Sequence, residues 1–290
     1  MHDLFLRLIS TQDLAGLYQP EALPYLLLVV VLLWLGKLIY ARTVPYDLIQ
    51  AVASDDNKAA TVSFAGFMFG LGVVLWGVMT AHGVPDLASD LLDMALLGVM
   101  GIVLLVSGQW AADRLVYRGF VLRDCLARGN LAAGVAEAGG FVATGLIVRQ
   151  AVTIDGDTLL VRLVDSLVFF VLAQCCFVLF AAAYHRVARY QVLEQLEAGN
   201  AAVGVSLALT FVAMGSVLGY AIGETGSAVV FGAWFLLSAF LLVAFRTFVD
   251  RVLLPNHSLD DELSRDRNWG VALVEGGLAV VMSLVLTGAF

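Results

Sequence analysis

The sequence predicts an all-α, polytopic membrane protein. Of its 290 residues, 61% are hydrophobic and only 14% are charged, and the mean hydropathy is +0.91. A water-soluble domain of this length would carry more charge. The apolar runs are about 20 residues long, which is the length that a helix needs to cross about 30 Å of hydrocarbon. Because the runs are continuously apolar and do not alternate, they predict helices and not a barrel.

These runs predict eight spans, and the charged residues between them predict an orientation. The spans are expected at 23–41, 58–79, 91–111, 131–151, 160–184, 201–222, 227–246 and 269–290. Of the 16 Lys and Arg residues, thirteen lie in or beside the connections after the first, third, fifth and seventh spans. The positive-inside rule therefore places these connections in the cytoplasm of a bacterium and both termini on the periplasmic side of its inner membrane. A short helix on the membrane surface is also expected over residues 4–19.

Every second span begins with an asparagine. Asn57, Asn130, Asn200 and Asn268 are separated by 73, 70 and 68 residues. A small side chain lies two residues after each asparagine, and a glycine or serine lies fifteen residues after it. Two spans per interval restore the starting orientation, so the pattern predicts four parallel two-helix repeats. Fourfold and paired twofold arrangements are both compatible with it.

A second level of duplication divides the chain into halves. Glu137 and Glu275 each lie seven residues after their asparagine, in the second and fourth repeats. The first and third repeats have Phe64 and Leu207 at that position. This alternation predicts two fused four-helix membrane halves, residues 1–152 and 153–290.

An asparagine, then small residues, then glycine further along the span is typical of one known family. Segments such as "GNLAAGVAEAGGFVATG" and "RNWGVALVEGGLAVVMS" resemble the starts of alternate spans in the YjfL-like family of bacterial inner-membrane proteins. The resemblance covers nearly the whole chain in two tandem copies. It implies a helical inner-membrane protein of unknown function, with four spans per copy and a link to membrane-stress or polyamine-related gene clusters. It implies no reaction and no catalytic residue.

The four asparagines are expected to cap their helices at the cytoplasmic mouth of the protein. An asparagine side chain can accept a hydrogen bond from an unpaired backbone amide in the first turn. Each helix N-terminus also carries about half an elementary positive charge. If the four ends converge on one axis, they form a weak anion-attracting ring.

Glu137 and Glu275 are the candidate ion or proton site. Seven residues at a rise of about 1.5 Å place each carboxylate roughly 10 Å into the membrane, where a charge is unfavourable. No Lys or Arg is expected in any span core to neutralise it. Three interpretations remain: a protonated side chain in a structural hydrogen bond, a cation or proton site facing a shared wet interior, and a catalytic acid or base. The expected hydrogen-bond partners are hydroxyls or amides such as Thr144, Thr210, Ser206 and Gln174, or water in a cavity.

Asp93 and Asp165 are a second pair of candidates. They lie 37 and 35 residues before Asn130 and Asn200. Each is expected in the first turn of an outer-side span, where a carboxylate compensates the helix dipole. Alternatively, they line an outer mouth opposite the glutamates. Gln109, inside the third span, is expected to bond a neighbouring helix.

No enzyme, cofactor or metal site is expected. The three cysteines and four histidines show no disulfide framework and no metal-ligand spacing. The chain has no nucleophile elbow, phosphate loop or hydrolase-like carboxylate pair. Its formal net charge of −8 gives no support to nucleic-acid binding.

Two functions from different classes remain. The first is a small-ion or small-cation channel or transporter, in which Glu137 and Glu275 form a central intramembrane pair. The alternative is a non-conducting scaffold or stress sensor that recruits a cytoplasmic protein through its arginine-bearing connections. The amphipathic segments "DRLVYRGFVLRDCLARGN" and "HRVARYQVLEQLEAGN" also fit an anionic membrane surface. The expected partners are thus the lipid bilayer and either a small cation or proton or a cytoplasmic protein. Assembly of several copies is left open.

Overall fold

The computed structural model describes residues 22–80, 86–117, 122–154, 156 and 158–289. Every regular element in these ranges is a helix, as the composition predicts. The surface helix expected over residues 4–19 lies outside the described residues.

Eight of the described helices are long and apolar enough to cross a membrane, which confirms the predicted fold class. They agree with the expected spans to within a few residues. The largest difference at a start is in the third span, which begins four residues early because Asp86 caps it by accepting a 3.0 Å hydrogen bond from the Ser89 amide. The spans are α2 (Ala22–Thr43), α3 (Lys58–Thr80), α4 (Leu87–Leu115), α6 (Leu131–Val152), α7 (Leu159–Val187), α9 (Ala201–Glu224), α10 (Ala228–Phe248) and α12 (Trp269–Gly288).

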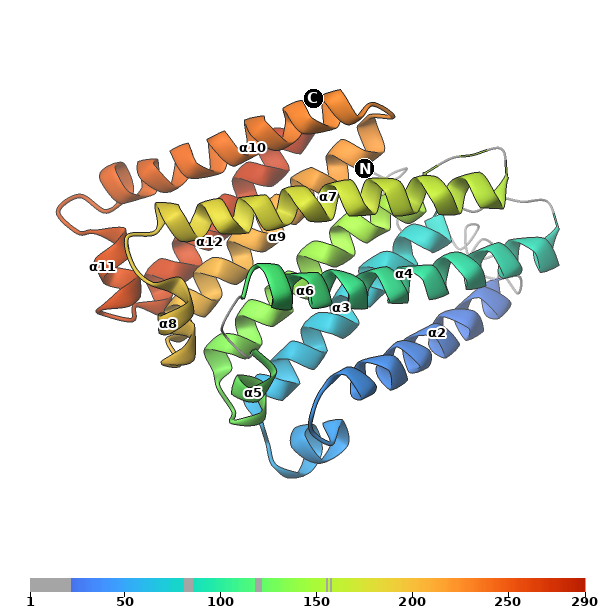
Figure 1. Cartoon of the computed structure of the whole chain (residues 1–290), viewed down its shortest axis with the longest axis horizontal. Coiled ribbons are helices and arrows are strands. Elements are labelled where there is room, and N and C mark those ends of the chain that lie inside the picture. The colour runs from blue at the N-terminus through green and yellow to red at the C-terminus, as the bar shows by residue number, and fades with distance from the viewer. Residues whose placement is uncertain (1–21, 81–85, 118–121, 155, 157, 290) are drawn as a thin grey trace, which may run out of the picture.

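Short helical segments connect the spans at one face of the molecule. Three of them are single α-helical segments, α5 (Leu122–Ala127), α8 (Val192–Glu197) and α11 (Leu259–Ser264). The two others are wide turns, η2 (Gln50–Ser54) and η3 (Val249–Leu253). We call this side of the molecule the short-helix face, since all four helices that start with an asparagine begin there (Figure 1).

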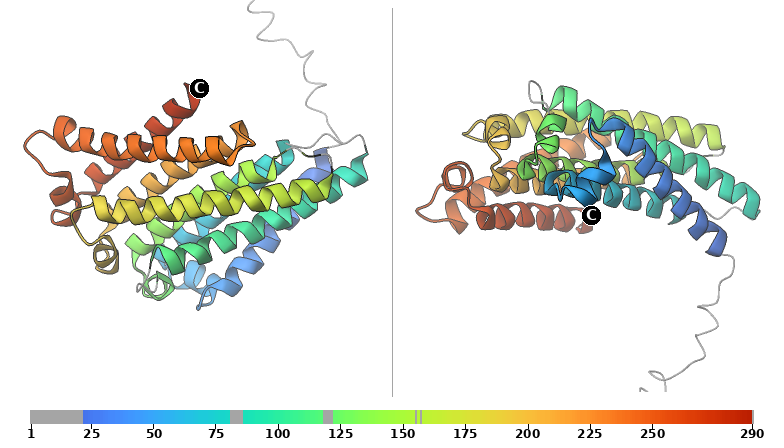
Figure 2. Two further views of the ribbon diagram at one scale, coloured as in Figure 1. Left: turned by 45° about the horizontal axis from the view of Figure 1, so that its top comes forward. Right: turned by 90° about the horizontal axis from the view of Figure 1, so that it is seen from below.

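The spans form two layers. One layer is a row of parallel helices in the order α3, α6, α9, α12, in which each helix packs mainly against its neighbours in the row. The other layer, α2, α4, α7 and α10, crosses this row at an angle (Figures 1 and 2). Helices α3 and α12 therefore lie at opposite ends of an open row. The four asparagine-led helices therefore do not converge on one axis, so the condition for the anion-attracting ring is not met.

The row is held together by small residues at its helix contacts. A Cβ atom added to Gly66 of α3 would lie 2.4 Å from the Cα atom of Ala138 on α6. A Cβ atom on Gly139 of α6 would lie equally close to the Cα atom of Ala208 on α9. Within a membrane, such close approach gains dispersion contacts where a hydrophobic driving force between helices is absent. The row consequently leaves no opening between α3, α6 and α9 at these levels.

Candidate functional site

The first-half cluster is built around Glu137, which projects from α6 into its contact with α3. The Ser63 hydroxyl of α3 donates a hydrogen bond to Glu137 Oε2. The Tyr40 hydroxyl of α2 lies 2.8 Å from the Ser63 oxygen. Three helices thus contribute one side chain each, and all three side chains are buried.

Helix α4 completes the first-half cluster with an amide instead of a cation. Gln109 Nε2 donates to Glu137 Oε1 over 3.1 Å and to Asp113 Oδ1 over 3.0 Å. Asp113 in turn pairs with Arg123, whose Nε lies 3.4 Å from its carboxylate. Among the described residues, no Lys, Arg or His forms an ion pair with Glu137 itself.

The second-half cluster repeats the same three side chains around Glu275 of α12. The Ser206 hydroxyl of α9 donates to Glu275 Oε2 over 2.6 Å. The Tyr184 hydroxyl of α7 lies 3.0 Å from the Ser206 oxygen. Of the four side chains expected as partners of the two glutamates, only Ser206 forms a hydrogen bond with one of them. The serines were missed as a pair, although both lie six residues after an asparagine.

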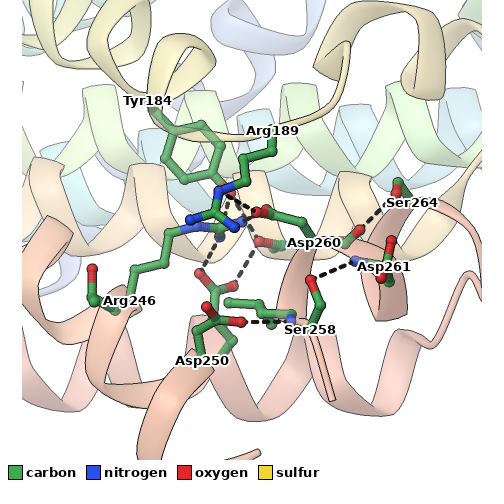
Figure 3. Close-up of polar contacts among 12 residues, drawn as sticks. Tyr184, Arg189, Arg246, Asp250, Ser258, Asp260, Asp261 and Ser264 are labelled. Carbon is green, nitrogen blue, oxygen red and sulfur yellow. Dashed lines mark hydrogen bonds and ion pairs between the residues drawn. The ribbon is translucent and has the colours of Figure 1, made fainter. Parts of the chain in front are cut away.

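A buried arginine distinguishes the second-half cluster from the first. Arg246, in the last turn of α10, donates to Glu275 Oε1 and to Asp260 Oδ1, both over 2.8 Å. It also donates to the Tyr184 hydroxyl over 3.2 Å. Figure 3 shows this arginine with Tyr184, Asp260 and the exposed Arg189, whose Nε is 3.9 Å from Asp260. The expectation that no Lys or Arg neutralises the glutamates is wrong for Glu275, because the long side chain of Arg246 at the end of its span reaches back into it.

The two glutamates do not form a pair. Glu137 lies at the contact of α3 with α6, whereas Glu275 lies at the contact of α9 with α12, and the α6–α9 contact separates the two. Each lines its own small cavity of about 10 Å³, which has room for about one water molecule. The predicted shared wet interior is therefore wrong, and any ion or proton chemistry belongs to one half at a time.

Two tyrosines lie close to the clusters but outside the spans. Burial raises the pKa of Tyr46 to about 12. Burial also raises the pKa of Tyr190 well above its ordinary value. Both phenols consequently stay neutral at physiological pH. The described residues contain no group of three or more His, Cys, Asp and Glu side chains that could hold a metal ion.

Each asparagine lies at the N-terminus of its row helix and accepts a hydrogen bond from a first-turn amide. The donors to Asn57, Asn130 and Asn268 are the amides three residues later, over 3.1–3.2 Å. Asn200 accepts from Ala202 and Val203. The residue before each asparagine has a positive φ, between 46° and 77°. This left-handed residue turns the chain from the connection into the helix, and glycine occupies it in the second and third repeats.

The asparagine amides do something that the sequence did not indicate. Nδ2 of Asn57 donates to the Leu126 carbonyl of α5, which belongs to the following repeat. Asn130 and Asn200 likewise donate to the carbonyls of Leu196 and Leu263, at the ends of α8 and α11. These three distances are 2.8–2.9 Å. Each of these three caps therefore ties its helix to the next connection along the row.

The predicted outer pair of aspartates is not equivalent in the structure. Asp93 forms an ion pair with Arg162 of α7. Asp165 makes no side-chain hydrogen bond or ion pair with any residue that the structure describes. Neither lies in the first turn of its helix, because α4 and α7 begin at Leu87 and Leu159. The structure therefore gives these two residues no common role.

Eight apolar spans with broad lipid-facing surfaces define a helical, multi-pass integral membrane protein. Bulky apolar side chains such as Leu236, Phe240 and Trp34 are 59–69% exposed, which a water-soluble monomer would avoid. The chain belongs to the family described as Domain of Unknown Function (DUF350), which matches residues 11–152 and again residues 158–290. The predicted tandem resemblance to a membrane family of unknown function is thereby confirmed.

One curated relative is similar to part of the chain. The UPF0719 transmembrane protein of Aquifex aeolicus (strain VF5) is 26% identical over 126 residues, which is 43% of this chain and 47% of the relative. The chain thus spans about half the length of the curated relative that it matches. No solved structure matches.

Proposed function

We propose that this protein moves protons or small cations across a bacterial inner membrane, with Glu137 as the exchangeable group. The observation that carries the proposal is that this carboxylate is buried without a cationic partner. It is only 3% exposed, and its described partners are Ser63 and Gln109, both neutral. A buried acid without a paired cation is unfavourable in a membrane and is usually functional. Glu275 has a direct cationic partner in Arg246, so we assign the second half a structural role.

Further buried polar side chains lie where α4, α6 and α7 meet, on the side of Glu137 away from the short-helix face. Gln174 Nε2 donates to the Gly108 carbonyl over 3.2 Å, while its Oε1 atom is buried and has no hydrogen-bond partner among the described residues. Thr144 lies next to Gly108 and is also buried. An unsatisfied buried acceptor is a natural place for a water molecule. These groups support a proton or cation route between the two layers, beginning at Glu137.

The polar residues continue towards the N-terminus of α7, which lies away from the short-helix face. The Ser166 hydroxyl donates to the Ala151 carbonyl over 2.7 Å. One turn closer to the N-terminus of α7 lies the ion pair of Arg162 with Asp93. We propose that this ion pair forms the periplasmic end of the route and that the short-helix face is cytoplasmic, as the distribution of Lys and Arg indicates.

Proteoliposomes that contain the purified protein test the proposal. We expect proton or small-cation flux in the parent protein and its loss in Glu137→Gln. The matched control Asp165→Asn removes a carboxylate that has no described partner and should leave the flux unchanged. Gln109→Arg would place a cation against Glu137, as in the second half, and should also stop the flux. A parent protein without flux, or Glu137→Gln with parental flux, would disprove the proposal.

A non-conducting scaffold is the second candidate function, because the close contacts within the row leave no opening there. A polar pocket of about 110 Å³ opens at the short-helix face beside Arg189, Arg251, Asp250 and Asp260. This pocket would be the docking site of a cytoplasmic partner. A scaffold would lose that partner in pull-downs when Arg189 and Arg251 are replaced by alanine, and its parent would show no flux. We propose no catalytic reaction for either candidate.

A further inference from the structure

Each helix of the row has two faces that can meet neighbours in the row. In α6, one face carries the residues 2, 6, 9 and 13 positions after the asparagine and contacts the following helix. We call it the leading face. The opposite, trailing face carries positions 4, 8, 11 and 15. Two contacts define the pairing: position 9 meets position 8 of the next helix, as in Gly139 with Ala208, and position 2 meets position 4, as in Ala132 with Gly204.

The two end helices of the row each have one of these faces uncovered by the described part of the chain. The leading face of α3 and the trailing face of α12 are fully buried within the row. On the trailing face of α3, Ala65 and Gly72 are exposed. On the leading face of α12, Val274 and Val281 are 55% and 51% exposed. The row thus ends in two faces that are of opposite type.

Both uncovered faces keep glycines that the single chain does not use. A Cβ atom added to Gly72 or Gly277 would meet nothing within 4 Å. At the equivalent positions inside the row, a Cβ atom on Gly145 or Gly139 would lie 2.6 Å or 2.4 Å from the neighbouring backbone. Glycine weakens a helix relative to alanine. Its presence at two uncontacted positions that match the tight contacts of the row indicates that a further helix packs there.

The hydrogen bonds from the asparagine amides to the next repeat stop at α12, the last helix of the row. Asn268 is exposed, and its amide donates to the Glu262 side chain of its own connection, 3.0 Å away. Inside the row, that amide would reach a main-chain carbonyl of the next repeat. Next to Asn268 lies an apolar groove of about 630 Å³ lined by Leu253, Gly270, Val274 and other residues of η3 and α12. In the first three repeats, the corresponding place is filled by a short helix of the next repeat.

At the other end of the row, η2 has the complementary defect. The short helices α5, α8 and α11 each contact their own row helix and the preceding one. Among the described contacts, η2 packs mainly on its own row helix, α3, and Ile49 at its start is 54% exposed. The short helical segment at the start of the row thus lacks a preceding row helix, and α12 at its end lacks a following short helix.

We propose that a second copy of this chain docks head to tail on α12, so that its α3 continues the row. The contact repeats the geometry that already occurs three times within the chain, with Gly277 opposite Ala65 and Gly270 opposite Thr61 of the second copy. The Asn268 amide then donates to the Ala53 or Ser54 carbonyl of the second copy's η2. Such an interface joins two different faces, so it can repeat from copy to copy, as a ring where the rotation closes and as an open row where it does not. This inference does not depend on the proposed transport function.

Substitutions at the unused glycines test the interface. We expect native mass spectrometry from nanodiscs to give several copies for the parent protein. Gly277→Leu and Gly72→Leu should each shift the main species to one copy. Each variant should still fold with the helix content of the parent protein, because neither side chain meets anything in the single chain. Gly232→Leu on α10, where an added Cβ atom also meets nothing within 4 Å, is the matched control and should keep the parental mass. A monomeric parent, or equal masses for all variants, would overturn the proposal.

Cysteine cross-linking tests the head-to-tail order. Inside the chain, position 6 of one repeat contacts position 7 of the next, as in Ser63 with Glu137. The counterparts across the new interface are Val274 and Phe64. After Cys125, Cys175 and Cys176 are replaced by alanine, Val274→Cys combined with Phe64→Cys should give an oxidised ladder of dimers and higher species. Gly277→Leu should abolish this ladder.

Three cross-linking outcomes would contradict the proposal. A dimer formed by Val274→Cys alone would mean a twofold interface. A disulfide between Phe64→Cys and a cysteine introduced within residues 1–21 of the same chain would mean that the chain covers this face itself. The absence of any link in the double variant, with wild-type folding, would mean that lipid covers both faces.

Discussion

The two halves of the molecule hold their buried glutamates with the same side chains but neutralise them differently. In both halves a tyrosine hydroxyl lies against a serine, and the serine donates to the glutamate. In the first half Glu137 then meets the amide of Gln109, whereas in the second half Glu275 meets the guanidinium of Arg246. Gln109 and Arg246 lie 28 and 29 residues before their glutamates. The duplication has thus kept the scaffold and changed the charge at one position.

The difference shows which part of the site is structural. A buried ion pair holds two helices in a fixed arrangement but leaves neither partner free to exchange a proton easily. A carboxylate that is held by two neutral donors keeps its hydrogen bonds in either protonation state, after a rotation of the donor. This difference is the reason why the proposed function uses Glu137 of the first half and gives Glu275 of the second half a structural role.

The largest effect on stability is expected at Arg246. Arg246→Met leaves Glu275 and Asp260 without their common cation, and breaking a buried ion pair typically costs about 3–5 kcal/mol. Gln109→Met in the first half removes a neutral donor and should cost about 1–2 kcal/mol. Thermal or denaturant unfolding in detergent measures both. Equal losses would mean that the two halves do not differ in the way proposed here.

Removing the serine hydrogen bond should destabilise the first half more than the second, which is the reverse of the order expected for Gln109→Met and Arg246→Met. A hydrogen bond to a charged group contributes about 1.5–3 kcal/mol. We expect Ser63→Ala to lie near the upper end, because Glu137 keeps only Gln109 afterwards, and Ser206→Ala near the lower end, because Arg246 remains. The same unfolding assay decides this. A larger loss for Ser206→Ala would contradict the assignment of Arg246 as the main partner of Glu275.

The smallest effects are expected at the asparagine caps, and they should depend on position in the row. Asn200 is fully buried and bridges to the Leu263 carbonyl, so Asn200→Ala should cost about 2 kcal/mol. Asn268 is exposed, and Asn268→Ala should cost about 0.5–1 kcal/mol in a single chain. Hydrogen exchange at the starts of α9 and α12 would locate the two losses. If assembly engages Asn268, its loss should grow in nanodiscs that hold several copies.

The periodic features of the fold were accessible from the sequence because they depend on local properties. Span length and apolar content predicted all eight membrane helices, and the interval between asparagines predicted where every second one begins. A capping asparagine acts within one turn of its own position, so its place can be read without knowledge of the neighbours. Asp86 shows the limit of such reading, since the helix that it caps begins earlier than the apolar run of α4.

The site depends on contacts between distant segments, so only part of it could be predicted from the sequence. Glu137 and Glu275 stand out as acids within apolar runs. Nothing local shows that the four asparagine-led helices form a linear row, which keeps the two glutamates apart. Arg246 was missed because a residue at the edge of a span was assigned to the connection. Its side chain reaches Glu275 only because α10 packs on α12. Ser63 and Ser206 carried a usable signal, since both lie six residues after an asparagine in the repeats that lack the glutamate.

The contact of α6 with α9, where the two family copies meet, has a consequence for the history of this architecture. The linker between the copies is only a few residues long. At the short-helix face, Asn130 of the first copy bridges to the end of α8 in the second copy. The same joint between separate polypeptides would need no covalent connection, because the small residues and the bridging amide already supply the fit. A tandem chain can also let its two copies differ, as they do here: Glu275 has a counter-ion in Arg246, whereas Glu137 has none among the described residues.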